Sequence, residues 1–531
     1  MRTEIMTTFP VFLSNSSEIA KNQEGTQLDI SSFIFQNNDS YSYWGGVSPL
    51  PNRKKEMNNC VTLYKLRYLR NCFLPEKSLL KFYFLTFMSG GIYIYIDVKL
   101  NIDSRRRCNV SVLSSLLTIY NQIMTVSFDI IICGGGLAGL ACAIGLVRAG
   151  HRVTVLESTR ELSEVGAGIQ VPPNSVRILK EYGIYDKFTN VVTRPESIVI
   201  KRYENGQTLN STPLDPEMTE KYGNPYLLIH RADYLKILYE LAVEAGVVIK
   251  KNSRVVEVDG NIRTVTLKNG DTYTGDLIIG ADGIKSNVRD SAVVTEETVL
   301  PLPSSYCAYR VTIPGEVMAA DPVISHLMTE IKSTCWIGYR RHIMAYPIRD
   351  GTLYNMVMIH PGQAAVGVWN EPADLEEMRN HFKDWDPVVC QLLSHVDKSL
   401  KWVLADMPRL PRWVKGRVAL IGDAAHSMLP FLAQGAAQGI EDGATLVNEL
   451  EKISKVEEID QALVRYEKRR MRRVHTIQAG ARSIGETWHL PDGDDQVERD
   501  IKMKAKEDHN PNKWSDNEFQ HWLFGWNAFT D

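Results

Sequence analysis

Three glycines and one acidic residue have the spacing of a phosphate-binding turn. Gly134, Gly136 and Gly139 follow an apolar run, residues 128–133, and precede a stretch of helix formers, while Glu157 ends the next apolar run. The first glycine permits a tight turn, the second lets the backbone approach a pyrophosphate, and the third lets helix and strand pack closely. The helix N-terminus offers free N–H groups to phosphates, and Glu157 is expected to accept hydrogen bonds from ribose hydroxyls. Strand, turn, helix, second strand and acid together predict dinucleotide binding; a glycine-rich turn of another α/β protein is the alternative.

Two later segments repeat the pattern of a buried strand followed by an acid-containing turn. Residues 277–280 precede Asp282, and residues 418–421 precede Gly422 and Asp423. Together with the glycine turn, and in this order, these motifs resemble those of the class A flavoprotein aromatic hydroxylases, the para-hydroxybenzoate and salicylate hydroxylase type. The resemblance covers residues 128–529, and the closing segment from residue 488 onward is similar to the fungal salicylate hydroxylase-like branch.

The resemblance implies that FAD is the cofactor. It also implies roles for three residues in the C-terminal part of the chain. Asp423 would accept hydrogen bonds from the ribityl hydroxyls. The N–H groups of Gly435 and Ala436, which begin the next helix, would face the flavin ring, and that positive helix end would stabilise the anionic reduced flavin. For Asp423, a simple helix cap is the alternative.

Three further residues match cofactor positions of the family. Arg231 resembles the arginine that contacts the cofactor, and Gly168 matches a backbone turn between the adenosine and flavin parts. Asp282 would serve both FAD and the transient nicotinamide, since NAD(P)H is expected to visit the flavin from outside and leave. A surface arginine at a helix start is the alternative for Arg231.

The pattern of elements predicts an α/β fold. The resemblance implies a Rossmann-like FAD-binding domain of the GR2 type, interleaved with an antiparallel-sheet substrate domain and followed by C-terminal helices. We assign residues 124–298 to the Rossmann-like part, 299–407 to the antiparallel sheet, and 408–531 to the Gly-Asp motif and the C-terminal helices.

The expected antiparallel strands carry the candidate substrate residues. Arg310 could orient a carboxylate or phenolate, and Tyr346 could hydrogen-bond a phenol oxygen and help remove its proton. Sheet packing is the alternative for both, and His342 is expected to be structural. Phe431 departs from the polar group that some relatives carry there, which suggests an apolar contact with the substrate ring and argues against simple salicylate specificity.

The resemblance implies an FAD-dependent, NAD(P)H-using monooxygenase that hydroxylates an aromatic or electron-rich small molecule, in secondary metabolism or aromatic catabolism. In the family mechanism the nicotinamide reduces FAD, O2 adds to give a C4a-hydroperoxyflavin, and the substrate attacks its terminal oxygen. An epoxidase, a Baeyer–Villiger oxidase or a desaturase on a secondary metabolite is one alternative, and a non-catalytic flavin-binding protein is another.

Composition excludes several other classes. The net charge of the 531 residues is −3, which is no electrostatic signature for nucleic acid, and eight cysteines without a CxxC pair favour reduced thiols in the cytoplasm. No metal site is predicted, and we expect a monomer or homodimer.

The apolar run 79–96 is split by glycines, so a membrane span is the less favoured interpretation. The basic segment 465–473 is expected to be a solvated helix face.

Residues 1–123 differ in character from the rest of the chain. They show no sustained helical or strand period, and Met124 stands directly before a strong strand pattern. We expect a poorly ordered N-terminal extension of unknown role, with the enzyme proper beginning at Met124. A targeting sequence is the alternative, although the first residues match neither a signal peptide nor an Arg-rich transit peptide.

Overall fold

The apolar run before the glycine turn forms the centre of a parallel sheet. Strand β3 (Asp129–Cys133) pairs with β4 (Arg152–Leu156) on one side and β14 (Leu277–Gly280) on the other, and its isoleucines are at most 4% exposed. The six-stranded sheet has the order β10-β4-β3-β14-β22-β21, completed by β10 (Val248–Lys250), β22 (Val418–Leu420) and β21 (Val414–Lys415). Only β21 runs antiparallel to its neighbour. Burial on both faces explains why these strands are continuously apolar.

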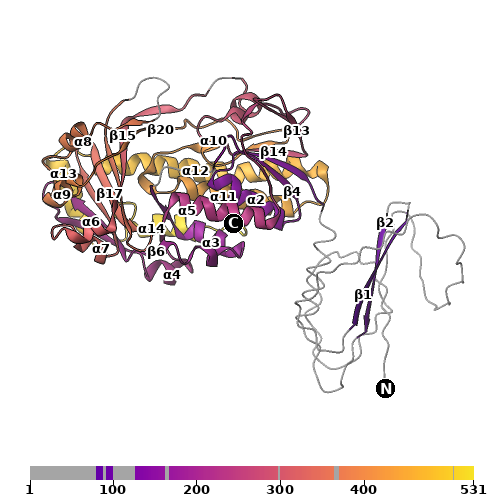
Figure 1. Ribbon diagram of the computed structural model, residues 1–531, viewed down its shortest axis with the longest axis horizontal. Coiled ribbons are helices and arrows are strands. Elements are labelled where there is room, and N and C mark those ends of the chain that lie inside the picture. Colours follow the sequence, from indigo (N-terminus) through magenta and orange to yellow (C-terminus); the bar gives the residue numbers. More distant parts are fainter. Residues whose placement is uncertain are drawn as a thin grey trace, which may run out of the picture. The chain divides into compact units, whose positions relative to one another are not determined.

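The computed structural model describes residues 126–161, 167–296, 299–363, 370–505 and 507–531, and the two strands β1 (Leu79–Phe87) and β2 (Gly91–Lys99) (Figure 1). The chain divides into two compact units, Met1–Ser115 and Leu116–Asp531. In the first unit, β1 and β2 pair in antiparallel register, so the apolar run 79–96 is divided between two strands. The expected poor order of the remaining extension, and the proposed start at Met124, lie outside the described residues. Within the described part of the chain, no helix is both long and apolar enough to cross a membrane.

Helix α2 (Leu137–Arg148) packs against the parallel sheet, and helices α5 (Arg231–Ala245) and α11 (Gly435–Glu451) pack against α2 (Figure 1). The contact between α2 and α11 requires glycine. A Cβ atom at Gly439 would lie 2.9 Å from the Cβ of Ala138, and one at Gly443 would lie 2.8 Å from the Cβ of Cys142. This close approach brings the N-terminal turns of the two helices together at the same edge of the sheet.

The second large element is an eight-stranded sheet with the order β19-β20-β15-β18-β17-β16-β7-β8. Its strands are β7 (Ser197–Arg202), β8 (Thr208–Pro213), β15 (Leu302–Pro314), β16 (Lys332–Gly338), β17 (Arg341–Ile348), β18 (Leu353–Pro361), β19 (Asn370–Pro372) and β20 (Leu400–Asp406). All neighbours are antiparallel except β7 and β16, which run parallel. Strands β7 and β8 come from within the range that we assign to the Rossmann-like part, so the two sheets are interleaved in sequence. The α/β fold class predicted from the sequence is confirmed, whereas the domain boundaries stay a prediction.

The two faces of this sheet have different coverings. One face packs against the short helices α6 (Gly315–Ala320), α7 (His326–Thr329), α8 (Leu375–His381) and α9 (Pro387–Ser394), and buries Tyr309, Trp336 and Met356. The other face, with Ala308, Tyr346 and Ile359, packs against the C-terminal helices and Phe431. The candidate residue Tyr346 lies on this second face.

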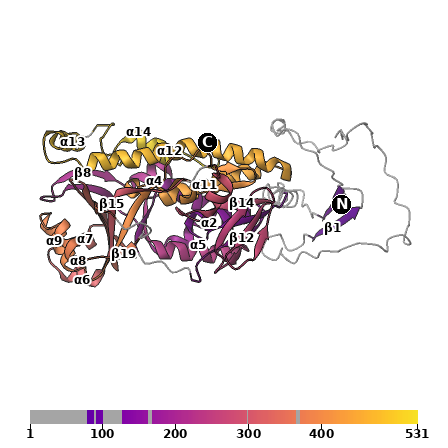
Figure 2. The ribbon, with the colours of Figure 1, turned by 90° about the horizontal axis from the view of Figure 1, so that it is seen from above.

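Helix α12 (Ile459–Trp488) connects the two sheets. Over its 30 residues it passes both of them (Figure 2). The Tyr466 hydroxyl donates to the carbonyl of Leu420 beside the parallel sheet, and the Gln478 amide donates to the carbonyl of Met407 further along. Helices α13 (Asp494–Lys504) and α14 (Asn517–Gly525) follow it. Helix α12 therefore packs in the core of the parallel sheet and in that of the eight-stranded sheet.

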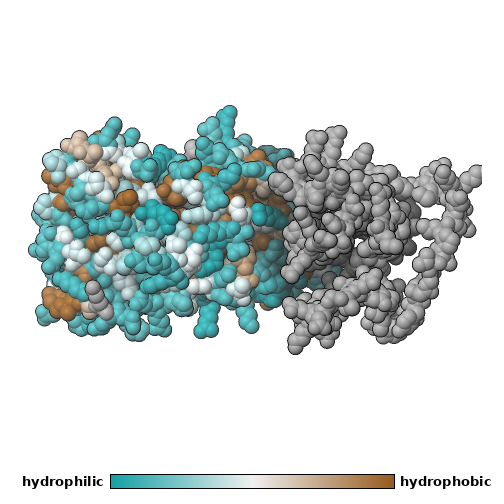
Figure 3. Space-filling view, turned by 90° about the horizontal axis from the view of Figure 1, so that it is seen from below, coloured by the Kyte–Doolittle hydropathy of each residue, from teal (hydrophilic) through white to brown (hydrophobic). Residues whose placement is uncertain are grey.

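Shorter elements complete the fold. They are β5 (Gly168–Val171), β6 (Val192–Thr193), β9 (Leu227–His230), β11 (Val255–Asp259), β12 (Thr264–Leu267), β13 (Thr272–Thr274), α3 (Pro173–Glu181), α4 (Glu217–Tyr222), α10 (Asp423–His426), η1 (Tyr185–Phe188), η2 (Arg289–Val293), η3 (Pro430–Leu432) and η4 (Val456–Glu458). The face in Figure 3 is mainly hydrophilic, with hydrophobic residues scattered over it.

Candidate cofactor and substrate site

The glycine turn between β3 and α2 has the geometry that its spacing predicts. Gly134 has φ +114°, and a Cβ atom there would lie 2.2 Å from the carbonyl oxygen of Ala281. A Cβ at Gly139 would lie 2.1 Å from the carbonyl oxygen of Gly134, so the first turn of α2 rests directly on the strand end. A Cβ at Gly136 would meet no atom within 4 Å. The backbone is therefore tightly packed at Gly134 and Gly139, whereas the space beside Gly136 is open. A phosphate can approach the backbone at Gly136.

Glu157 lies beside the glycine turn and hydrogen-bonds to its backbone. It is 8% exposed, and one carboxylate oxygen accepts the Gly135 N–H at 2.8 Å. The other oxygen accepts the Thr159 N–H at 2.7 Å. A carboxylate has about four lone-pair sites, so both oxygens keep capacity for a ribose hydroxyl. The predicted ribose contact is compatible with this arrangement.

Replacing Glu157 by Ala should weaken FAD retention. Loss of a hydrogen-bonded charge should cost about 1.5–3 kcal/mol, roughly 10- to 150-fold in affinity. Glu157→Gln should lose less, because an amide oxygen can still accept the Gly135 N–H. Fluorescence titration of apoprotein with FAD measures both values, and an alanine variant with wild-type affinity would contradict the assignment.

Asp282 closes its own turn with its side chain. Its carboxylate accepts hydrogen bonds from the Ser286 hydroxyl at 2.5 Å and from the N–H groups of Asn287 at 2.8 Å and Val288 at 3.2 Å. Burial raises the pKa of Asp282, and these hydrogen bonds oppose that rise. The Asp282 carboxylate thus shapes the loop beside Gly134, and the loop's backbone is the part that faces the glycine turn.

The Gly-Asp motif lies at the end of β22. Asp423, the first residue of α10, is exposed, and none of the described residues hydrogen-bonds its carboxylate. Gly422 has φ +61°, and its N–H donates to the Asp442 carboxylate at 2.9 Å. The same oxygen of Asp442 contacts Nε2 of His426 at 2.5 Å. Asp442 on α11 therefore anchors the loop that presents Asp423.

Helix α11 begins where the Gly-Asp motif predicts a flavin-facing helix. Gly435 is its first residue and Ala436 its second, and both are half-buried. The first N–H groups of a helix have no intrahelical partner. A Cβ at Gly435 would meet only Met428, at 3.9 Å. The N-terminus of α11 can therefore receive an electron-rich group, and its contact with the flavin stays a prediction.

A buried charge network beneath α11 was not predicted. Arg470 and Arg473 of α12 are 0% and 6% exposed, so the expected solvated face of the basic segment is wrong at these two positions. Arg470 donates to Asp442 at 2.8 Å and to Glu441 at 2.6 Å, and Arg473 donates to Glu441 at 2.9 Å. Although burial opposes ionisation, the two arginines hold the pKa of Glu441 below its ordinary value. The three-residue spacing of the arginines, which places them on one helix face, was the available signal.

Gly168 and Arg231 lie close together, at the start of β5 and directly after β9. The N–H of Gly168 donates to the Asn355 side chain at 2.6 Å, and a Cβ there would lie 2.6 Å from the Tyr346 ring. Arg231 is the first residue of α5, and its N–H donates to the carbonyl of Ala167 at 2.9 Å. The structure thus brings Gly168 next to Tyr346, a contact that the spacing in sequence does not reveal.

Arg310 and Tyr346 share the sheet face that is turned away from helices α6–α9. Arg310 on β15 pairs with Val357, and Tyr346 on β17 pairs with Asn355, so the two positions flank the same stretch of β18. The Arg310 guanidinium lies 5.3 Å from the Trp402 ring centroid. Tyr346 is 2% exposed, and burial raises its pKa. Tyr346 is therefore a neutral hydrogen-bonding group at neutral pH.

Phe431 belongs to a cluster of aromatic and histidine rings on that same face. Its ring centroid lies 4.8 Å from that of His342, 5.7 Å from that of His489 and 6.3 Å from that of Tyr306. Phe431 is 3% exposed. The expected contact of Phe431 with a substrate ring stays a prediction, and the two histidines beside it give the cluster polar atoms that the sequence did not indicate.

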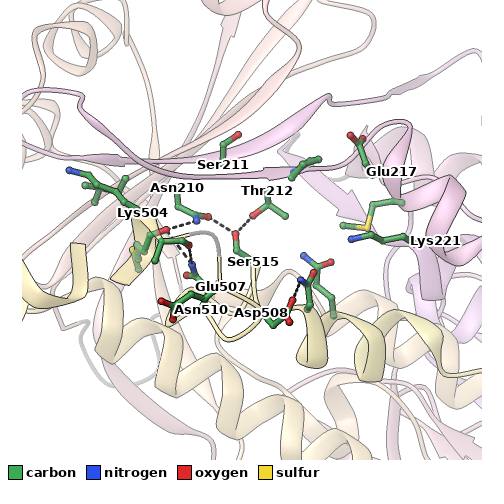
Figure 4. A pocket seen from close by; sticks show the side chains of 17 residues that line it. Asn210, Ser211, Thr212, Glu217, Lys221, Lys504, Glu507, Asp508, Asn510 and Ser515 are labelled. Carbon is green, nitrogen blue, oxygen red and sulfur yellow. Dashed lines mark hydrogen bonds between the residues drawn. The ribbon is translucent and has the colours of Figure 1, made fainter. Parts of the chain in front are cut away.

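A groove of about 340 Å³ lies elsewhere, along β8 and the connection from α13 to α14. Figure 4 shows Asn210, Thr212 and Ser515 joined by hydrogen bonds at its floor. None of the predicted site residues lines it. Among the described residues, no group of histidine, cysteine and acidic side chains could hold a metal ion.

The residues present fit FAD. The open turn at Gly136, the exposed Asp423 carboxylate and the free N-terminus of α11 lie at one edge of the parallel sheet, because the carboxyl ends of parallel strands meet there. The backbone of the turn at Gly136 suits the phosphates of FAD, the Asp423 carboxylate suits the hydroxyls of its ribityl chain, and the N–H groups of α11 suit the oxygen atoms of its ring.

Comparisons with known proteins support the same interpretation. Residues 127–481 match the family described as "FAD binding domain". An FAD-dependent monooxygenase of Beauveria bassiana is 34% identical over 406 residues, covering 75% of this chain and 95% of that protein. The 3-hydroxybenzoate 6-hydroxylase 1 of Aquipseudomonas alcaligenes is 34% identical over 67% of this chain and 88% of its own length. A salicylate hydroxylase substrate complex superposes with a TM-score of 0.63 and 26% identity, covering 76% of this chain and 96% of that one.

Proposed function

The chain belongs to the FAD binding domain family and is an FAD-dependent monooxygenase, and we propose that it hydroxylates a small phenol bound between the flavin and the eight-stranded sheet. The observation that supports this substrate class is the shared sheet face of Arg310 and Tyr346, together with the packing of Tyr346 in the same buried cluster as Phe431. A cation, a neutral phenol donor and an aromatic ring suit a planar ring that carries oxygen substituents.

The chain's own residues would bind and orient the two reactants. When bound and reduced by NAD(P)H, FAD would supply the electrons that activate O2, whose one oxygen atom enters the product while the other leaves as water. Asp423 and the N-terminus of α11 would hold the cofactor, and Glu157 would hold its ribose. Arg310 would pair with an anionic substituent of the substrate, and Tyr346 would donate a hydrogen bond to the oxygen that becomes phenolate. Phe431 would exclude water from the ring, which protects the activated oxygen from wasteful decay.

The direct test is a screen of phenols and hydroxybenzoates for accelerated NADPH and NADH oxidation by the FAD-loaded protein. Products are identified by mass spectrometry. A hydroxylated phenol is the expected product. Protein that cannot be reconstituted with FAD, or that no phenol stimulates, would contradict the proposal and favour a flavin-binding protein without this activity.

Arg310 and Tyr346 should separate binding from coupling. Arg310→Lys should weaken binding of an anionic phenol by about 10- to 150-fold, because a compact ammonium cannot reproduce the planar guanidinium contact. Tyr346→Phe should lower the hydroxylation rate by a similar factor, since a hydrogen bond to a charged oxygen is worth about 1.5–3 kcal/mol. More hydrogen peroxide per NAD(P)H is expected for Tyr346→Phe. Two variants with wild-type affinity and coupling would assign both residues to sheet packing.

We also propose that the protein works in the cytoplasm, as a monomer or homodimer, without nucleic acid or membrane partners. The five cysteines in the described residues are all free thiols, which suits a reducing compartment. Size-exclusion chromatography with light scattering measures the oligomeric state.

A further inference from the structure

Trp402 on β20 lies on the same face of the eight-stranded sheet as Arg310. In the antiparallel pair of β15 and β20, Trp402 is opposite Ala308 and Leu400 is opposite Arg310, so Trp402 is the diagonal neighbour of Arg310. Paired residues share a face of the sheet, and Ala308 packs in the buried cluster that contains Tyr346. Trp402 therefore faces the side of Tyr346, away from helices α6–α9.

The Trp402 ring lies over the Arg310 guanidinium. The guanidinium carbon is 5.3 Å from the ring centroid, inside the limit of about 6 Å for an attractive cation–π contact. Both side chains are half-buried, and partial removal of water strengthens such a contact. An arginine side chain has several rotatable bonds, so a ring against one side of the guanidinium leaves it fewer orientations. Trp402 therefore restricts where the charge of Arg310 can lie.

A stacked ring does not use the hydrogen-bond donors of a guanidinium. The N–H groups lie in the plane of the group and point outward from its edges, in a fork that matches a carboxylate. An acidic partner for Arg310 would occupy that fork, whereas the Trp402 ring lies over the guanidinium and fixes its plane. The contact between the two side chains thus prepares Arg310 for a two-point contact with a carboxylate.

The charge of Arg310 reaches the Tyr346 hydroxyl across the same face. Burial raises the pKa of Tyr346, and the positive charge of Arg310 opposes that rise. Arg310 is opposite Val357 and Tyr346 is opposite Asn355, two residues apart on β18. A cation and a neutral phenol at this spacing suit a ring that carries a carboxylate at one position and a hydroxyl at another.

We propose that Trp402 is a positioning residue that holds the Arg310 guanidinium for the carboxylate of a hydroxybenzoate-type substrate, and that it gives the site a preference for anionic over neutral phenols. The inference rests on the proposed function and narrows its substrate class to carboxylated phenols. Because Trp402 acts through Arg310, its loss should weaken the binding of anionic ligands and leave the binding of neutral ligands unchanged.

Ligand binding to oxidised, FAD-loaded protein tests this role without turnover. The absorbance change of the flavin measures binding of the tightest of 2-, 3- and 4-hydroxybenzoate, and of the neutral carboxamide of the same acid. Trp402→Leu keeps an apolar side chain without a ring, so it should weaken hydroxybenzoate binding by about 3- to 30-fold, the range for loss of a cation–π contact. Binding of the carboxamide should stay at its wild-type value. Trp402→Phe keeps a ring and should lose less than Trp402→Leu.

A double-variant cycle separates this role from packing. In an Arg310→Gln background, Trp402→Leu should cause no further loss of hydroxybenzoate affinity, because the cation on which the ring acts is absent. The matched control is Trp522→Leu. Trp522 also lies over an arginine, Arg473 at 5.0 Å, but it is 38% exposed and belongs to α14. This variant should bind both ligands with wild-type affinity.

Wild-type hydroxybenzoate affinity in Trp402→Leu, or equal losses for the hydroxybenzoate and its carboxamide, would overturn the proposal. If Trp402→Leu does not retain FAD, Trp402→Met, whose longer side chain fills more of the space, is measured in the same way. Turnover of neutral phenols but of no hydroxybenzoate would also overturn the proposal and leave the proposed function standing. A wild-type protein that no phenol stimulates contradicts the proposed function instead, and this inference then falls with it.

Discussion

Arg470→Ala should destabilise the folded protein by about 3–5 kcal/mol, the cost of leaving a buried charge without its partner. Arg470 is fully buried and bonds Asp442, Glu441 and the Gln438 side chain. Without Arg470, the buried negative charges of Glu441 and Asp442 on α11 lose part of the positive charge that balances them. Because Asp442 also holds Gly422, FAD retention should fall together with stability. Chemical denaturation of apoprotein and FAD titration measure the two effects.

Arg472→Ala is the matched control for Arg470. Arg472 is exposed on the same helix, and exposed substitutions of this kind usually change stability by less than about 0.5 kcal/mol. Equal stability of the two variants would show that the buried network does not support α11.

Gly139→Ala should abolish tight FAD binding. The added Cβ would lie 2.1 Å from the Gly134 carbonyl, and backbone cannot move aside cheaply, so the cost should reach or exceed the upper end of the about 1–3 kcal/mol typical of overpacking. Gly136→Ala should behave differently. Its Cβ meets no atom within 4 Å, so the apoprotein should keep its stability while FAD binding weakens.

This contrast locates the phosphate. Thermal unfolding of apoprotein and FAD titration of both variants supply the measurements. Wild-type FAD affinity in Gly136→Ala would mean that the open side of the turn does not face the cofactor, and the dinucleotide assignment would then fail.

The parts of the site that could be predicted from the sequence are those whose chemistry is local. The turn at Gly134–Gly139 and the acid at Glu157 depend on a strand end and the few residues after it, so spacing indicates their positions, whereas the role of Asp423 is implied by the family resemblance. The buried apolar runs likewise predict parallel strands with both faces covered, as β3 and β14 show.

Features that depend on distant segments could not be predicted in this way. His489 lies 147 residues from His342 in sequence, and only the path of α12 brings the two rings together. Strands β7 and β8 read as part of the Rossmann-like region, yet they complete the eight-stranded sheet. The sequence around Arg470 does not distinguish it from the other arginines of the basic segment, because its partners Glu441 and Asp442 belong to another helix.

Incorporation of labelled oxygen tests the central assignment most directly. FAD-loaded protein, NADPH and the best phenol from the screen are incubated under 18O2, and the product is analysed by mass spectrometry. A monooxygenase that hydroxylates the ring predicts a product carrying one 18O atom, and the same product unlabelled when the 18O is supplied as water. Product without 18O from O2, or NADPH consumption that yields only hydrogen peroxide with every phenol, would contradict it.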